Sequence, residues 1–315
     1  DTAGASAMVM QGMIEEGYDR PFSVAVTCAS STIGIIIPPS IPLIIYAWVA
    51  NTSISALFLA GIIPGILIGL AQIFISVYQG HRRNYPKHPR VPFRQLLKDT
   101  YEAIPVLILP LIILGGIFSG VFTATEAAVV AVFYALALGL ILKELTFKKV
   151  LDCLVLTGVT SAISLLLVGS TAPNTWMLAL NHVPTKIATW FSAVTTNQTV
   201  FLLLVTAFML MIGCVMDNDP VILLTTPIFL PVAVKLGISP ILYGTIVNIA
   251  LAIGLVTPPV GCVLFVGCAV GKTTIPEVIR DFVPFYLVMI FVVLMLIFFP
   301  EIVLFLPRKF MPLSL

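Results

Sequence analysis

Two short blocks of the sequence place a glycine four and five residues before a pair of prolines. The first reads Ile33-Gly-Ile-Ile-Ile-Pro-Pro-Ser40, and the second reads Ile253-Gly-Leu-Val-Thr-Pro-Pro-Val260. Proline lacks an amide hydrogen and its ring clashes with the preceding turn, so neither block can continue a regular helix. Main-chain carbonyls that lose their helical partners in this way can coordinate Na⁺. The spacing therefore predicts two helix breaks that are lined by oxygen atoms.

The candidate Na⁺ ligands are the oxygens of these two blocks and their edges. They are Gly34, Ile37, Gly254, Thr257 and Gly261. Thr257 is the sharpest candidate, because its hydroxyl and its carbonyl directly precede the proline pair and can converge on one small hard cation. The alternative is a proline kink that only shapes helix packing. Two blocks in register favour the ligand interpretation.

A second polar feature is Met216-Asp-Asn-Asp-Pro220, which lies between apolar runs at 199–212 and 221–234. Neither run reaches the roughly 20 residues that a membrane-spanning helix needs. A polar tip between two short apolar arms predicts a re-entrant hairpin with its tip beside the second proline block. An exposed loop between two short spans is the alternative.

The candidate residues for the substrate and for the hairpin tip are prolines and polar residues of the same segments. They are Pro38, Pro39, Ser40, Asp217, Asp219, Asn248, Pro258 and Pro259. Asn248 lies six residues before Gly254, where it could bridge helices or touch a substrate. A hydrogen bond that serves only packing is an equally good interpretation of Asn248.

The elements that hold these residues must be apolar helices. Of the 315 residues, 59% are hydrophobic and 10% are charged, whereas soluble domains carry about 25% charged residues. This composition excludes a water-soluble globule, a disordered chain and a nucleic-acid-binding protein. The run from Pro21 to Gly80 contains no Lys, Arg, Asp or Glu. As one helix it would be about 90 Å long, so it must fold back within a bilayer core of about 30 Å. The predicted fold class is an all-α polytopic membrane protein.

The chain also carries an internal repeat. A shift of 220 positions places Gly17 to Pro64 on Gly237 to Pro284 without a gap, and both proline blocks coincide. Paired Gly/Pro-interrupted hydrophobic segments in two halves of a chain are the best sequence pointer to the binding site of a secondary transporter. We therefore expect two structural repeats, each with a broken helix and a re-entrant hairpin.

Basic residues predict the orientation in the membrane. The segment Gly80 to Glu102 carries six basic residues, and a second patch holds Lys143, Lys148 and Lys149. Two expected spans, at 103–122 and 124–142, lie between these two basic patches. Two crossings bring the chain back to its starting side, so both patches lie on one face, which the positive-inside rule identifies as cytoplasmic. Pro92 to Glu102 has the pattern of an interfacial amphipathic helix.

Two local motifs concern the helices themselves. Thr123-Ala-Thr-Glu126 forms a Thr-x-x-Glu capping box at the start of the second of these spans. The spacing Gly61-x-x-x-Gly65-x-x-x-Gly69 lets two helices approach closely, and we interpret it as scaffold packing.

Motifs for other chemistry are incomplete. Gly267 to Thr273 resembles a phosphate-binding loop, but GxxxxGK[ST] requires glycine where Val266 stands. The five cysteines have no CxxC spacing, which favours small buried apolar residues over a redox or metal role. No relay of ionisable residues runs through the apolar segments, so Na⁺ held by neutral oxygens is the expected coupling ion, and no cofactor is expected.

Four stretches together resemble one family, the large membrane subunit of tripartite ATP-independent periplasmic (TRAP) transporters, the DctM-like permeases. They lie across nearly the whole chain, at Thr32 to Ile41, Gly115 to Ala128, Met216-Asp217 with Pro220, and Gly254 to Gly261.

The resemblance implies a secondary transporter of the bacterial inner membrane that works as an elevator. In this family, Na⁺-driven uptake of organic acids such as C4-dicarboxylates and sialic acid needs a small DctQ-like membrane subunit and a soluble periplasmic binding protein. By this resemblance, Gly34 to Ser40 belong to a first broken helix with one Na⁺ site. Cys214 to Pro220 form the second hairpin tip, and Gly254 to Gly261 form the second broken helix with another Na⁺ site.

The predicted organisation follows from the repeat and the resemblance. It comprises a first transport-domain repeat at 1–53, scaffold helices with the basic loop 80–102 at 54–198, a second transport-domain repeat at 199–273, and a C-terminal scaffold helix at 274–315. On the 220 shift, Asp1 pairs with Val221, just past the second tip. We therefore expect that the first hairpin tip and the first scaffold helices are missing before Asp1.

Two other functions remain open at this point. One is a Na⁺- or H⁺-coupled carboxylate transporter that needs no binding protein. The other is an intramembrane enzyme that uses Asp217 or Asp219, a function for which the sequence offers no further support.

Overall fold

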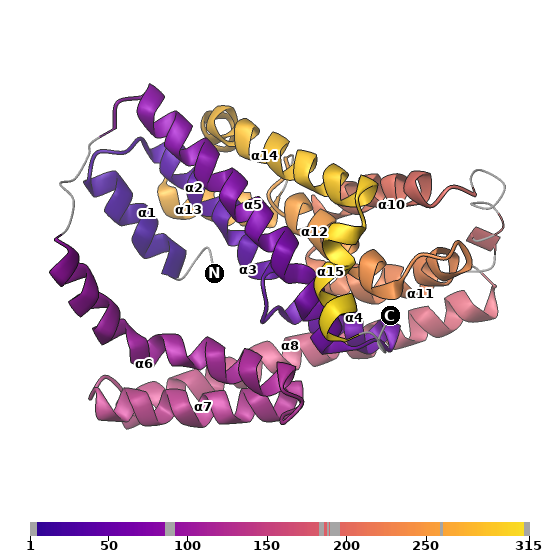
Figure 1. The fold of residues 1–315 in the computed structure, drawn as a ribbon, viewed down its shortest axis with the longest axis horizontal. Coiled ribbons are helices and arrows are strands. Elements are labelled where there is room, and N and C mark those ends of the chain that lie inside the picture. The colour runs from indigo at the N-terminus through magenta and orange to yellow at the C-terminus, as the bar shows by residue number, and fades with distance from the viewer. Residues whose placement is uncertain are drawn as a thin grey trace. The chain divides into compact units, whose positions relative to one another are not determined.

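The computed structural model describes residues 5–85, 92–182, 186–187, 189, 196–258 and 261–311. Within these ranges the regular elements are all α-helices, and no strand is present (Figure 1). The all-α fold class is therefore confirmed. In the described part of the chain, five stretches are long and apolar enough to cross a bilayer: Arg20–Ala50, Ile54–Arg82, Phe93–Phe118, Ala124–Ile141 and Ile275–Phe298.

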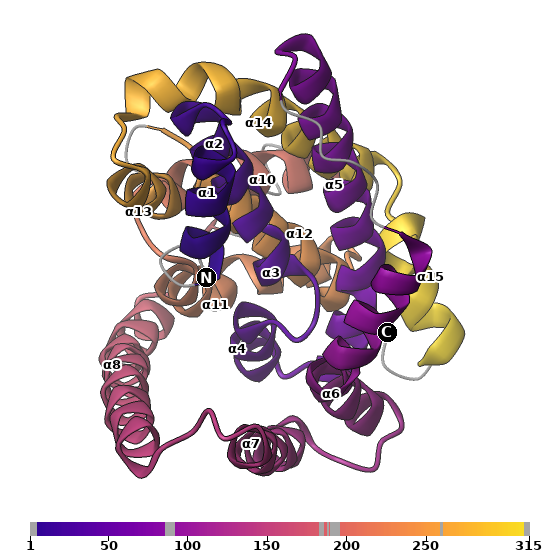
Figure 2. The same ribbon diagram turned by 90° about the vertical axis from the view of Figure 1, so that its left-hand side faces the viewer.

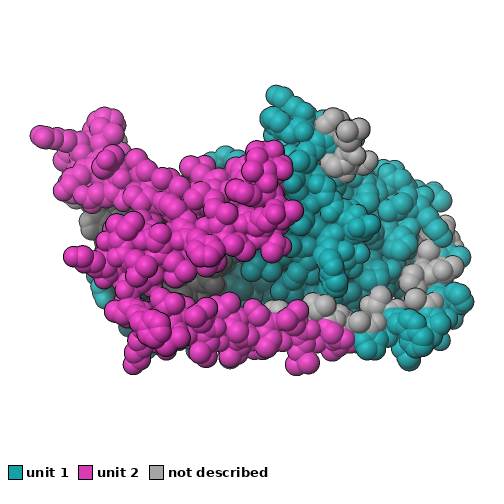
Figure 3. Space-filling view, turned by 90° about the horizontal axis from the view of Figure 1, so that it is seen from below, with its two compact units in different colours: residues 1–86, 171–315 teal, residues 87–170 magenta. Residues whose placement is uncertain are grey.

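The chain divides into two compact units, which Figure 3 shows in different colours. Unit 1 contains residues 1–86 and 171–315, and unit 2 contains residues 87–170. The helices of unit 1 are α1 (Ala5–Glu15), α2 (Arg20–Ser31), α3 (Ile33–Ile36), α4 (Ile41–Ala50), α5 (Ile54–Arg82), α10 (Gln198–Gly213), α11 (Asn218–Lys235), α12 (Pro240–Gly254), α13 (Cys262–Gly271), α14 (Ile275–Phe298) and α15 (Glu301–Phe310). Unit 2 holds α6 (Phe93–Phe118), α7 (Ala124–Ile141) and most of α8 (Phe147–Leu180).

In unit 2, α6 packs against α7, and the Tyr134 hydroxyl donates a 2.7 Å hydrogen bond to the carbonyl of Pro105. The capping box is confirmed, because the Glu126 carboxylate accepts from the Thr123 amide at 2.8 Å. Pro92 to Glu102 is not a separate interfacial helix. No glycine or proline breaks the chain between Phe93 and Ile104, so this segment continues directly into the apolar part of α6.

Both proline blocks interrupt helices, as their composition predicts. Helix α3 ends at Ile36 and α4 begins at Ile41, while α12 ends at Gly254 and α13 begins at Cys262. We call residues 37–40 the first break and residues 255–261 the second break.

Unit 1 is built around α12, whose residues from Ile241 to Gly254 are all buried. Helices α3, α4, α5, α10, α11 and α14 all contact it (Figure 2). An amphipathic helix has one apolar face, whereas a helix that is apolar all round belongs in the interior. The continuous apolar character of α12 therefore explains its central position.

Helix α5 approaches α3 closely along its glycine spacing, so the predicted close approach of two helices is confirmed, while the interpretation as scaffold packing stays a prediction. A Cβ atom added to Gly61 would lie 2.6 Å from the Ile36 carbonyl oxygen. A Cβ atom added to Gly65 would lie 2.3 Å from the Ile37 side chain. Only glycine leaves room for such a short separation between the helix and its neighbour.

Candidate functional site

The first break leaves two carbonyls without helical partners. In a helix the amide of residue i+4 bonds to the carbonyl of residue i, so Pro38 and Pro39 free the carbonyls of Gly34 and Ile35. The Ile35 carbonyl accepts a 3.0 Å hydrogen bond from the side-chain amide of Asn248. The Ser40 hydroxyl donates to the same carbonyl. One freed carbonyl is therefore held by two polar side chains that the sequence had singled out.

Asn248 bridges the two repeated blocks, because it lies on α12, the helix that leads into the second break. Its side chain is buried, and its Oδ1 atom has no hydrogen-bond partner among the described residues. A buried amide oxygen without a partner costs free energy unless water or a ligand satisfies it. The bridging interpretation is confirmed for Nδ2, while Oδ1 remains available to a ligand.

The second break satisfies its freed carbonyls locally. The amide of Thr257 donates to the Gly254 carbonyl at 2.9 Å, and the amide of Val263 donates to the Leu255 carbonyl at 3.1 Å. The Thr257 hydroxyl donates its proton to the Ile253 carbonyl at 2.7 Å. With its proton engaged there, that hydroxyl oxygen keeps its lone pairs free to accept or to coordinate.

The tip of the second hairpin lies against the second break. The Gly261 amide donates to the Cys214 carbonyl at 3.0 Å. Just before these residues, α10 and α12 meet backbone to backbone, because a Cβ atom added to Gly254 would lie 2.8 Å from the Cα atom of Gly213. The predicted neighbourhood of the tip and the break is therefore confirmed.

The two acids of the tip are less enclosed than the residue between them. Asp217 is exposed and Asp219 is half-buried, whereas Asn218 is 2% exposed. The Asp217 carboxylate accepts from the Asn218 amide at 2.8 Å at the start of α11. Both side-chain amide atoms of Asn218 lack partners among the described residues. The sequence singled out the acids and missed Asn218, whose only signal was its place between them.

The remaining predicted site residues lie around the two breaks. Pro38 and Ser40 are buried, Ile37 and Pro258 are half-buried, and Gly34 and Pro39 are exposed. Pro259 lies outside the described residues. Among the residues that the structure describes, no group of three His, Cys, Asp or Glu side chains could hold a metal ion.

Apolar spanning helices, two interrupted helices and a hairpin tip against one of the breaks define a polytopic transport protein of the membrane. Residues 1–302 match the family model described as the tripartite ATP-independent periplasmic transporter, DctM component. The chain belongs to this family. It is a multi-pass protein of the inner membrane and not an enzyme.

Relatives of the chain are similar along nearly its whole length. It is 43% identical to the uncharacterized protein YgiK of Salmonella typhimurium, covering 99% of this chain and 73% of the relative. It is 38% identical to the sialic acid TRAP transporter large permease protein SiaM of Vibrio cholerae, with the same coverage. It is 34% identical to the C4-dicarboxylate TRAP transporter large permease protein DctM of Pseudomonas aeruginosa, covering 97% of this chain and 72% of the relative.

Proposed function

We propose that this large permease couples the inward Na⁺ gradient to the uptake of an organic acid, with the two breaks and the hairpin tip forming the transport site. The observation that carries the proposal is the bridge from Asn248 to the Ile35 carbonyl. It joins the helix of one block to the freed carbonyl of the other, and it leaves an amide oxygen buried and unpaired. Irregular backbone is tolerated at membrane depth where it is buried or lines a polar cavity.

The second break offers the better set of oxygen ligands for the cation. Thr257 offers a hydroxyl oxygen whose proton is already engaged, and the adjacent tip supplies the buried Oδ1 atom of Asn218 and the carboxylate of Asp219. Two acids beside Asn218 raise the local negative potential, which favours a cation and repels a carboxylate. We therefore assign the tip to the ion.

The substrate class is proposed from the relatives. Relatives that are named for a substrate carry sialic acid, C4-dicarboxylate, isethionate and ectoine in their names. Each of these compounds is an organic acid, with a carboxylate in three cases and a sulfonate in isethionate. We propose the same class for this chain, without choosing among the compounds.

Partners and movement are proposed from the family. The tripartite description fits a small DctQ-like membrane subunit and a periplasmic binding protein that delivers the substrate. We further propose an elevator mechanism, in which the segments that contain the two breaks move against the scaffold helices. Alternating access of this kind is largely the rigid-body movement of one bundle against another around a fixed site.

The proposal is tested by uptake into proteoliposomes that contain the permease and its small subunit. We expect radiolabelled organic acid to accumulate only with an inward Na⁺ gradient and with the binding protein outside. Accumulation without the binding protein would support the binding-protein-independent carboxylate transporter. Equal accumulation driven by a proton gradient in the absence of Na⁺ would overturn the assignment of Na⁺ as the coupling ion.

A further inference from the structure

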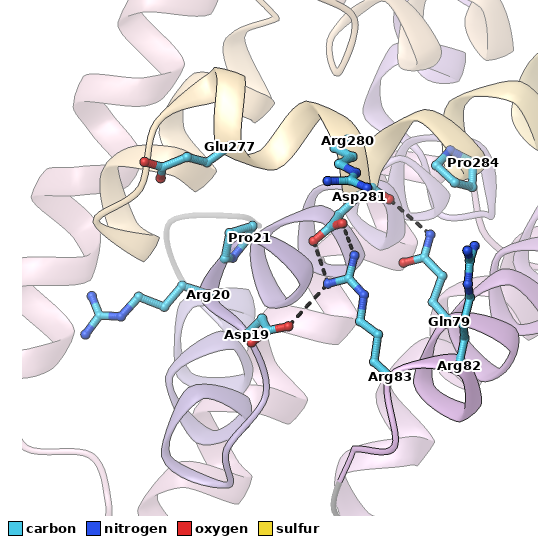
Figure 4. A pocket seen from close by; sticks show the side chains of 10 residues that line it. All are labelled: Asp19, Arg20, Pro21, Gln79, Arg82, Arg83, Glu277, Arg280, Asp281 and Pro284. Atoms are coloured by element: carbon cyan, nitrogen blue, oxygen red, sulfur yellow. Dashed lines mark hydrogen bonds and ion pairs between the residues drawn. The ribbon is translucent and has the colours of Figure 1, made fainter.

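A second polar centre lies far from the breaks along α5, at the end that leads into the basic loop. There a cavity of about 720 Å³ opens between the start of α2, the end of α5 and the first turns of α14 (Figure 4). Its lining includes four arginines and three acids. The positive-inside rule assigns this end to the cytoplasmic surface.

The acids of this cavity already have partners. Arg83 donates to Asp281 through both of its terminal nitrogens and also pairs with Asp19 at 3.3 Å. The Tyr85 hydroxyl donates to Asp19 at 2.7 Å. Glu277 accepts from the Thr274 amide in the capping box of α14. The negative charge in the lining is therefore largely engaged within the protein.

Three of the four arginines, Arg20, Arg82 and Arg280, have no such partner among the described residues. Among the residues that the structure describes, no acid pairs with Arg82 at the end of α5 or with Arg280 in the second turn of α14. Figure 4 shows their side chains near Gln79 and Asp281, whereas Arg20 extends away from Arg83 and Asp281. The cavity thus presents two uncompensated guanidinium groups from two helices.

Exposed apolar side chains continue from each arginine along its helix. One helical turn before Arg82 lies Tyr78, and one turn further lies Phe74, which are 57% and 70% exposed. On α14, Leu287 and Phe291 share the face of Arg280 and are 59% and 67% exposed. Helices α5 and α14 pack against each other. Residues four apart on a helix lie on one face, so both apolar stripes run from the cavity toward the membrane interior.

We propose that this cavity binds the phosphate headgroup of an anionic phospholipid, with Arg82 and Arg280 on the phosphate and the acyl chains along the exposed stripes of α5 and α14. Arginine presents a planar fork of donors that matches phosphate oxygens in pairs. Basic groups at the cytoplasmic surface also attract anionic lipids. A free phosphate ion would use the same two arginines but would gain nothing from the apolar stripes.

The test measures lipid binding to the purified full chain in detergent by native mass spectrometry. Phosphatidylglycerol, phosphatidylcholine and inorganic phosphate are the three probes. We expect phosphatidylglycerol to bind about tenfold more tightly than phosphatidylcholine. Both lipids carry the phosphate, but the quaternary ammonium of phosphatidylcholine cancels its negative charge and is repelled by the two arginines. The double variant Arg82→Gln, Arg280→Gln is expected to lose this preference. The matched control Arg20→Gln, on the arginine that extends away, is expected to retain it.

A second measurement on the unmodified chain keeps the test independent of how the variant folds. Raising the salt concentration screens charge interactions, so it is expected to weaken phosphatidylglycerol binding and to leave phosphatidylcholine binding unchanged. A salt-independent preference would overturn the proposal. So would competition by inorganic phosphate as strong as that by phosphatidylglycerol, which would mark a free-anion site. A double variant that folds and still prefers phosphatidylglycerol would also overturn it.

Discussion

The side-chain amide of Asn248 donates a 3.0 Å hydrogen bond to the main-chain carbonyl of Ile35, across 213 positions of sequence. It ties the buried centre of α12 to the first break, at a carbonyl that Pro39 leaves without a helical partner. Because the donor lies on the helix that leads into the second break and the acceptor lies at the first, this hydrogen bond connects the two breaks through α12.

Replacing Asn248 by leucine should destabilise the protein by about 1 kcal/mol and should impair uptake more than folding. The stability loss is small because Ser40 still donates to the Ile35 carbonyl, and one net hydrogen bond contributes roughly 1 kcal/mol. Thermal unfolding in detergent and initial uptake rates measure the two effects. Thr245→Val is the matched control on the same buried helix, because among the described residues the Thr245 hydroxyl bonds only to the Ile241 carbonyl within α12. Equal effects of the two substitutions would contradict a special role for Asn248.

Thr257→Ala should raise the Na⁺ concentration needed for half-maximal uptake, while expression stays close to that of the unmodified protein. We expect the affinity for Na⁺ to fall about tenfold, because an oxygen that contacts a charged group contributes roughly 1.5 to 3 kcal/mol. Thr257→Ser keeps the hydroxyl and serves as the control. An unchanged Na⁺ activation curve in the alanine variant would remove Thr257 from the ion site.

Gly213→Ala and Gly254→Ala should each destabilise the protein by roughly 1 to 3 kcal/mol, the usual cost of overpacking. At both positions the added methyl group would meet main-chain atoms, which cannot rotate aside as a side chain can. Gly80→Ala is the matched control, since an added Cβ atom there meets no other atom within 4 Å. In a helix this change should stabilise by about 0.5 to 1 kcal/mol. Chemical denaturation in mild detergent would compare the three variants, and similar behaviour would refute the backbone contact.

Arg83→Gln should be more damaging than Asp281→Asn, although both break the same ion pair. The side chain of Asp281 is 6% exposed, so loss of Arg83 leaves a buried carboxylate without its partner, which costs about 3 to 5 kcal/mol in buried pairs. Loss of Asp281 instead leaves Arg83 partly exposed and still beside Asp19. A double-mutant cycle on unfolding measures the difference. Equal losses would mean that burial of Asp281 does not determine the stability of the pair.

The contribution of Tyr85, just after the end of α5, to the stability of the protein should be lost at strongly alkaline pH. Burial, followed by the hydrogen bond to Asp19, raises the pKa of Tyr85 above the ordinary value of about 10 for tyrosine. A raised pKa means that the folded state favours the neutral phenol. This contribution is fully present below pH 10 or so, and it is lost as the pH rises through the pKa of the folded state. Unfolding followed across pH 9 to 12 should show the loss, and Tyr85→Phe should flatten that part of the curve.

The features that the sequence predicted correctly are local ones. The ends of α3 and α12 follow from prolines that cannot donate, and the capping box follows from the spacing of Thr123 and Glu126. The position of the second hairpin tip was also predicted, because two arms too short to span must turn back toward the neighbouring break. For the helix ends and the capping box, the physical cause lies within a few residues of the effect.

The features that it did not predict depend on partners far apart in the chain. Nothing near Arg83 indicates that it pairs with Asp281, because α5 and α14 meet only through tertiary packing. Asn218 was missed for a related reason. The acids on either side of it are the residues that usually mark a site. The burial of Asn218 becomes visible only once α11 is placed in the fold.

The close contact between α5 and α3 has a consequence for how the protein can move. The main chain of α5 lies directly against the Ile36 carbonyl at Gly61 and against the side chain of Ile37 at Gly65. If the proposed elevator movement takes place, we expect the first break and the first half of α5 to move together, so this part of α5 would not belong to the stationary scaffold predicted at 54–198. Under that proposal, the boundary between moving and stationary parts would lie further along α5, beyond Gly69.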